Sequence, residues 1–108
     1  MSDLKDLQQR ALEIREKYGR LESKEGGREW DRKDLMMGFV GDVGDLIKLV
    51  QAKEGVRRID DVDAKLAHEL ADCLWSVLVL AEKYGVDIEA AFTRTMSELD
   101  ARITEKLA

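Results

Sequence analysis

The sequence contains no proline, one cysteine and one histidine among its 108 residues. Without proline, no residue removes a backbone N–H from the interior of a helix, so long helices are permitted along the whole chain. A single cysteine excludes an intrachain disulfide, and with a single histidine it leaves too few ligands for a structural zinc site. Cys73 lies in the apolar run ADCLWSV, where we expect a buried structural thiol.

Long apolar runs and an excess of positive charge are also absent. The longest apolar run, residues 73–81, is too short to span a bilayer, and MSDLKDLQQR at the start has no signal-peptide pattern. We therefore expect a cytoplasmic protein with no membrane partner. The net charge of −5 argues against a nucleic-acid partner, because sequence-independent binding depends on cationic contacts to phosphate. A small anionic substrate is compatible with this net charge, because a bound metal ion reverses the sign of the local charge.

Apolar residues recur at steps of three and four along most of the chain, which predicts an all-α protein. The pattern predicts four helices: residues 3–21, 32–54, 60 or 61–84, and 88–107. Asp31 and Asp87 are expected N-caps, and Gly55 and Gly85 are expected stops. Long helices with short connections indicate one helical-bundle domain over residues 1–108.

Two pairs of acids stand on successive predicted helices. GFVGDVGDL, residues 38–46, places Asp42 and Asp45 three residues apart, and HELAD, residues 68–72, does the same with Glu69 and Asp72. Residues three apart share one face of a helix, so antiparallel packing would bring four carboxylates to one seam. Such a cluster repels itself unless a cation lies between its members, and oxygen ligands on rigid helices suit Mg²⁺ or Mn²⁺. The pattern predicts a divalent-metal site for a phosphorylated ligand.

The same acids also have a simpler interpretation, because the chain contains 23 acidic residues. Lys48 can neutralise Asp45, and Lys65 can pair with Glu69. Spacing alone therefore leaves a solvated charged surface open. His68 lies about 100° from the acid face on the helical wheel, so we do not predict it to be a catalytic base.

The glycines beside the acids need a reason, since each costs up to about 1 kcal/mol relative to alanine within a helix. Gly41 and Gly44 flank Asp42. The missing side chains would let either a ligand or a neighbouring helix approach the backbone closely, and both interpretations stay open.

GFVGDVGDLIKLV followed by HELADCLWSVLVLAEKYGVDIEAAF resembles the MazG-like all-α NTP pyrophosphohydrolases, and among them the small dCTP-pyrophosphatase-type branch. The family signature is ExxE on one helix and ExxD on the next. Those positions read Asp42, Asp45, Glu69 and Asp72 here. The resemblance covers residues 30–102, and the two half-motifs together are fairly specific.

The resemblance implies a four-helix bundle of the MazG-like type, completed by oligomerisation into a homodimer or homotetramer. It also implies Mg²⁺-dependent hydrolysis of a (d)NTP to a (d)NMP and pyrophosphate, as in nucleotide-pool housekeeping, with Mn²⁺ as an alternative ion. Asp42, Asp45, Glu69 and Asp72 would be both the catalytic residues and the metal ligands.

Five further residues are candidates for substrate binding. Trp30 resembles the family's base-stacking tryptophan, although it could simply cap the bundle. Trp75 is a candidate base contact or a core residue, and Ser76 stands where some relatives have a tyrosine near the base. Arg28 and Arg102 are candidate phosphate contacts, with solvated surface positions as the alternative.

The chain also departs from the family pattern at two of the acids and in the last helix. Relatives usually carry glutamate at positions 42 and 45, and aspartate is one methylene shorter, whereas Mg²⁺ requires ligand distances of about 2.0–2.1 Å. The last helix lacks the lysine and asparagine common in relatives. These departures keep a second hypothesis open, a catalytically degraded nucleotide- or metal-binding helical module. A third is a helical oligomerisation protein with coincidental acids.

Overall fold

The computed structural model describes residues 3–108, which form four helices and, within that range, no strand. The helices are α1 (Asp3–Lys24), α2 (Arg32–Lys53), α3 (Val62–Lys83) and α4 (Ile88–Leu107). The predicted all-α class is confirmed. α1 ends three residues later than predicted, because the Glu25 N–H still bonds to the Leu21 carbonyl (N···O 3.0 Å). No helix in the described part of the chain is long and apolar enough to cross a membrane.

Side-chain caps define two helix starts as predicted. Asp31 accepts a hydrogen bond from the Asp34 N–H (3.0 Å), and the Asp34 carboxylate accepts one from the Asp31 N–H (2.9 Å), which forms a capping box for α2. Asp87 accepts a bond from the Ala90 N–H (3.1 Å) at the start of α4. Asp61 precedes α3 in a left-handed conformation (φ 56°) and makes no side-chain cap bond.

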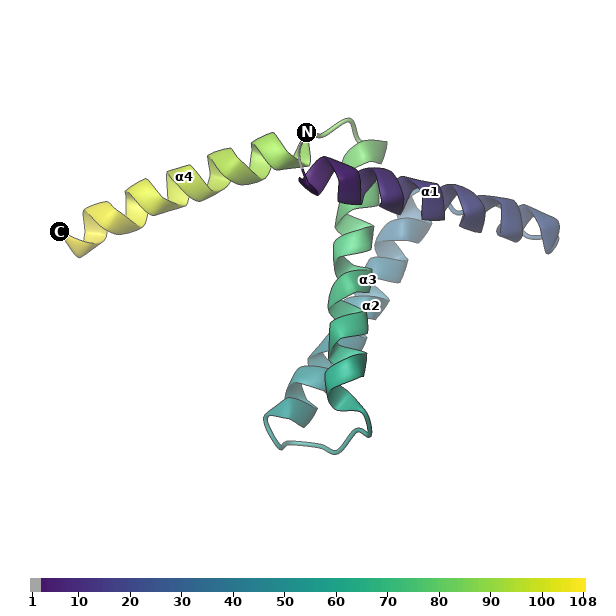
Figure 1. Cartoon of the computed structure of the whole chain (residues 1–108), viewed down its shortest axis with the longest axis horizontal. Helices are drawn as coiled ribbons and strands as arrows, with labels where there is room; N and C mark the ends of the chain where they lie inside the picture. The colour runs from purple at the N-terminus through teal and green to yellow at the C-terminus, as the bar shows by residue number, and fades with distance from the viewer. Residues whose placement is uncertain (1–2) are drawn as a thin grey trace.

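α2 and α3 form an antiparallel hairpin, and α1 lies across the end of that hairpin where α2 begins (Figure 1). The buried core gathers at this crossing: Ala11, Leu35, Leu78 and Val79. Two side chains attach α1 to α3, since the Trp75 Nε1–H donates to the Ala11 carbonyl (3.1 Å) and the Gln8 amide donates to the Leu78 carbonyl (3.0 Å). The far end of the hairpin receives no cover from α1 (Figure 1).

α4 projects away from the other three helices and contains no buried residue (Figure 1). The chain is accordingly extended: its radius of gyration is 17.2 Å, against about 13 Å expected for a compact domain of this length. The four helices therefore form an open arrangement within one chain. Completion of the bundle by oligomerisation stays a prediction.

α2 carries a second apolar face that no described residue covers. Only Leu35 and Leu49 of α2 are buried. The exposed row follows steps of four and three: Met36, Val40, Val43, Ile47 and Val50. The acids, not this row, face α3. The period of a helix identifies an apolar face without saying which neighbour covers it.

Candidate metal centre and adjoining cavity

The acids face each other because they occupy the contact positions of the α2–α3 pair. On α2, Asp42 lies seven residues from each of the two buried residues, Leu35 and Leu49, and seven residues are close to two helical turns. On α3, Glu69 and Asp72 continue toward the buried Ser76 and Val79 at steps of three and four. The same periodicity that packs the two helices thus turns carboxylates toward one another.

Three of the four predicted acids come together. Asp42, Glu69 and Asp72 are half-buried, and one carboxylate oxygen from each lies within 4.8 Å of the others. Asp45 lies on the same side of α2 but is exposed and outside this group. The predicted seam of four therefore becomes a cluster of three with Asp45 beside it.

Burial and mutual repulsion raise the pKa of two of these carboxyls. The pKa of Glu69 is raised first by burial and then by the charges of Asp42, Asp72 and Asp45. The pKa of Asp42 is raised by burial and then by Asp72 and Asp45. A folded-state pKa above the unfolded value means that folding is favoured at low pH and loses stability as the pH rises through the folded pKa. At neutral pH the ionised cluster therefore destabilises the metal-free protein.

One atom of the cluster is unsatisfied. Glu69 Oε2 is buried and, within residues 3–108, has no hydrogen-bond partner. A buried carboxylate oxygen without a partner carries a desolvation penalty of about 1–3 kcal/mol or more. A cation at this point would satisfy the oxygen and offset the repulsion, and hard oxygen donors are the ligands that Mg²⁺ and Mn²⁺ prefer. The cluster therefore fits the metal that the sequence predicts.

His68 contacts the cluster, contrary to our interpretation of the helical wheel. Its Nε2 lies 3.1 Å from Asp72 Oδ2 one turn along α3. The angle of about 100° separates His68 from Glu69, whereas residues four apart, such as His68 and Asp72, differ by only about 40° and are neighbours on a helix. Its side chain is 73% exposed, so it stands at the outer edge of the cluster.

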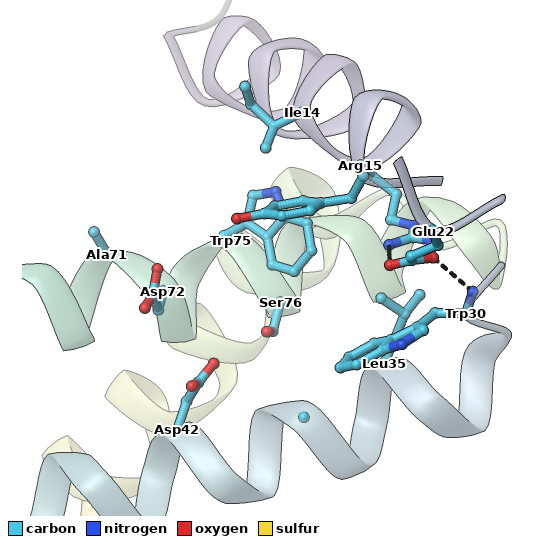
Figure 2. Close-up of a pocket in the computed structure, with 12 residues that line it drawn as sticks. Ile14, Arg15, Glu22, Trp30, Leu35, Asp42, Ala71, Asp72, Trp75 and Ser76 are labelled. Carbon is cyan, nitrogen blue, oxygen red and sulfur yellow. Dashed lines mark hydrogen bonds and ion pairs between the residues drawn. The ribbon is translucent and has the colours of Figure 1, made fainter. Parts of the chain in front are cut away.

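A cavity of about 570 Å³ adjoins the acids, between α1, α2 and α3 (Figure 2). Asp42 and Asp72 form part of its wall, and the remaining wall is mainly apolar and aromatic. The residues that line it are Ile14, Arg15, Tyr18, Glu22, Trp30, Leu35, Gly38, Asp42, Ala71, Asp72, Trp75 and Ser76. Three predicted substrate-binding residues, Trp30, Trp75 and Ser76, are thus brought together beside the carboxylates.

Trp75 and Ser76 belong both to the core and to the cavity. Trp75 packs against the core cluster, and its ring meets Tyr18 edge-on at a centroid distance of 6.1 Å. Ser76 is 2% exposed. The two interpretations of Trp75 are therefore compatible, because its side chain packs against the core cluster and also lines the cavity.

Gly38 is explained by Trp30. A Cβ atom at position 38 would lie 2.8 Å from Trp30 Cζ3, which is too close for an undisplaced ring. Gly41 and Gly44 have no heavy atom within 4 Å of their Cβ positions among the described residues. Tight packing within the chain therefore does not explain them, whereas the approach of a ligand or of another chain stays open.

Arg15 and Glu22 are cavity residues that we did not predict. Arg15 is only 4% exposed, and its guanidinium binds Glu22 through two hydrogen bonds (Nη1–Oε2 3.2 Å, Nη2–Oε1 2.9 Å). Glu22 Oε1 also accepts a bond from the Trp30 backbone N–H (2.8 Å), as drawn in Figure 2. The Arg15 hydrogen bonds are the main cause of a lowered pKa of Glu22. One signal was available, since Arg15 continues the steps of four and three from Ala11 to Tyr18 on the apolar face of α1.

The two remaining predicted residues lie outside the cavity. Arg28 pairs with Asp34, with Nη2–Oδ1 at 2.9 Å, and these hydrogen bonds are the main reason that the pKa of Asp34 falls to about 2. Arg28 therefore supports the start of α2. Arg102 is exposed on the projecting α4, where it meets no part of the cavity or the cluster.

Comparison with known proteins gives one match. The family model described as the MazG nucleotide pyrophosphohydrolase domain matches residues 32–105. This range contains α2, α3, most of α4 and all the clustered acids. No curated protein and no solved structure matches the chain.

The contact between Gly38 and Trp30 is testable with a matched pair of alanine substitutions. Gly41→Ala should raise the free energy of unfolding by about 0.5–1 kcal/mol, since alanine is the better helix former and the site is open. Gly38→Ala should be less stable than Gly41→Ala and should alone change the tryptophan emission spectrum, because the new methyl group displaces the ring. Equal stability of both variants with unchanged emission would contradict the contact.

Proposed function

The chain belongs to the MazG nucleotide pyrophosphohydrolase family, and we propose that it hydrolyses a (d)NTP to a (d)NMP and pyrophosphate in a Mg²⁺-dependent reaction. The observation that carries the proposal is that the carboxylate cluster and the aromatic cavity share Asp42 and Asp72. A nucleotide has an aromatic base at one end and anionic phosphates at the other. It therefore matches both features at once.

The base would stack in the cavity, with Trp30 as its principal wall. Stacking of a base on an aromatic ring contributes about 1–3 kcal/mol. Two contacts hold Trp30 in place before any ligand binds: its ring lies over Gly38, and its backbone N–H donates to Glu22. A preformed wall reduces the entropy lost on binding. Trp75 and Ser76 would complete the pocket from α3.

The metal would be held by Asp42, Glu69 and Asp72. Asp45 would contribute a fourth carboxylate from just outside the cluster. When bound, the divalent ion supplies neutralisation of phosphate charge and a lowered pKa for a coordinated water. The carboxylates would repel a triphosphate that carries no metal. The triphosphate would therefore bind here only as its metal complex. Glu69 Oε2 is buried at this point.

A catalytically degraded binding module is the second candidate. It is favoured by the position of Asp45, which has a shorter side chain than the family's glutamate and lies outside the group of three. Such a module would bind nucleotide in the Trp30 cavity without hydrolysing it.

We also propose that the chain works as a homo-oligomer, a dimer or a tetramer. α2 carries the exposed apolar row described above. α4 carries a similar exposed apolar row, formed by Phe92, Met96 and Ile103 at steps of four and seven. Such spacing is typical of helix–helix seams, and exposed apolar surface of this extent marks an interaction site. A second copy supplies matching rows with the same spacing by symmetry. A cytoplasmic location and a housekeeping role stay predictions.

The enzyme proposal is tested by pyrophosphate release from canonical and modified (d)NTPs, with and without Mg²⁺ or Mn²⁺. We expect metal-dependent turnover that falls by about 100-fold or more in Asp72→Asn, because losing a ligand should cost at least as much as losing an outer partner. Asp60→Asn, a change to an exposed acid outside the cluster, should retain wild-type turnover. Folded wild-type protein that binds nucleotides but hydrolyses none would instead support the binding module.

The oligomer proposal is tested by the molar mass in solution from light scattering. The wild type should have the mass of two or four chains, and Ile47→Glu, which places a charge in the α2 row, should shift it toward a single chain. Val56→Glu is the matched control, since Val56 is equally apolar but lies in the α2–α3 loop. A monomeric wild type would contradict the proposal.

A further inference from the structure

A second hollow lies on the other side of the carboxylate cluster. Its volume is about 410 Å³, and it opens between α2 and α3 toward the loop that joins them. Its lining is Asp45, Lys48, Leu49, Ile59, Asp61, Ala64, Lys65, His68 and Glu69. No residue of this set lines the first cavity, and no tryptophan, tyrosine or phenylalanine is among them.

The carboxylate cluster forms the boundary between the two spaces. Asp42 and Asp72 line the first cavity, whereas Glu69 lines the second hollow. Oxygens of these three residues lie within 4.8 Å of one another. A ligand whose reacting bond lies at the cluster therefore extends into the aromatic cavity in one direction and into the second hollow in the other.

The second hollow is lined by two lysines and three acidic residues. Lys48 and Lys65 are exposed at its wall, and neither ammonium group forms an ion pair with any residue that the structure describes. Lysine binds phosphate as a compact charge with three donors. Asp45, Asp61 and Glu69 line the same hollow, so a bare polyphosphate would be repelled and its magnesium complex fits better.

We infer that the second hollow binds the β- and γ-phosphates of the substrate, and afterwards pyrophosphate, through Lys48 and Lys65. This inference rests on the proposed function. In this orientation, a water oxygen forms a bond to the α-phosphorus while the bond from that phosphorus to the α–β bridging oxygen breaks. The bridging oxygen leaves with pyrophosphate into the second hollow. The water oxygen stays on the nucleoside monophosphate in the first cavity, and one proton is released.

This assignment gives the lysines a different role from the one that sequence spacing indicated. Lys48 and Lys65 were candidate partners that neutralise Asp45 and Glu69. Within residues 3–108 they form no ion pair with these acids, so their charges are available to a ligand. The basic residues that we expected near phosphate, Arg28 and Arg102, lie outside both spaces.

The test measures two ligands separately on the full-length protein. Calorimetry with inorganic pyrophosphate and Mg²⁺ probes the second hollow, and quenching of tryptophan emission by the four deoxynucleoside monophosphates probes the first. The variant is Lys48→Ala with Lys65→Ala; both side chains are exposed, so the fold should persist. Lys53→Ala is the matched control, because Lys53 pairs with Asp63 outside the hollow.

In the double variant we expect magnesium pyrophosphate to bind at least 10-fold more weakly and monophosphates to bind within twofold of the wild type. Lys53→Ala should change neither. Unchanged pyrophosphate binding, or an equal loss for both ligands, would overturn the inference. Lysine-dependent pyrophosphate binding by a protein that hydrolyses no (d)NTP would support the subsite while contradicting the proposed activity. Turnover of a (d)NTP, together with unaltered pyrophosphate binding in the double variant, would support the proposed activity and overturn the subsite.

Discussion

Three carboxylates repel one another where α2 packs against α3, and they limit how much apolar surface this part of the hairpin buries. Asp42, Glu69 and Asp72 occupy positions that would otherwise hold apolar contact residues, so this part of the hairpin gains little from burial. The compensating core lies at the end of the hairpin that α1 crosses. Most of the buried residues lie at the α1 end of this helix pair, and on α2 the carboxylate of Asp42 lies between the buried Leu35 and the buried Leu49.

The aromatic cavity depends on where α1 lies. α1 covers only the end of the hairpin where α2 begins, and a space remains between α1 and the acids. Trp30, from the α1–α2 loop, forms one wall of that space. Glu22 connects the buried guanidinium of Arg15 to the Trp30 backbone. Breaking that pair would leave a buried charge, which is typically costly. The Trp30 wall is therefore held by the folding of α1 itself, and not by the loop alone.

The sequence predicted the helices, the caps at Asp31 and Asp87, and the approach of α2 acids to α3 acids, because each depends on local spacing. It did not predict that Asp45 lies outside the group, since that depends on how the two helices are placed relative to one another and not on the spacing along either helix. Arg15 was missed because an arginine on an amphipathic helix usually reaches water, and its burial depends on Glu22 seven residues away. The sequence did not show what covers the exposed apolar row of α2, because periodicity does not distinguish a neighbour in the same chain from one in another chain.

The proposed divalent-metal site at the three carboxylates is tested by the free energy of unfolding of the wild type and of Glu69→Gln at pH 7. Each protein is measured with chelator and with Mg²⁺, at one protein concentration. Without metal, Glu69→Gln should be the more stable, because it removes one charge from the cluster. With Mg²⁺ at about 100 times its dissociation constant, the wild type should gain about 2.7 kcal/mol, and the variant should gain far less. An equal response of both proteins to Mg²⁺, or a wild type that is already more stable in chelator, would contradict the claim.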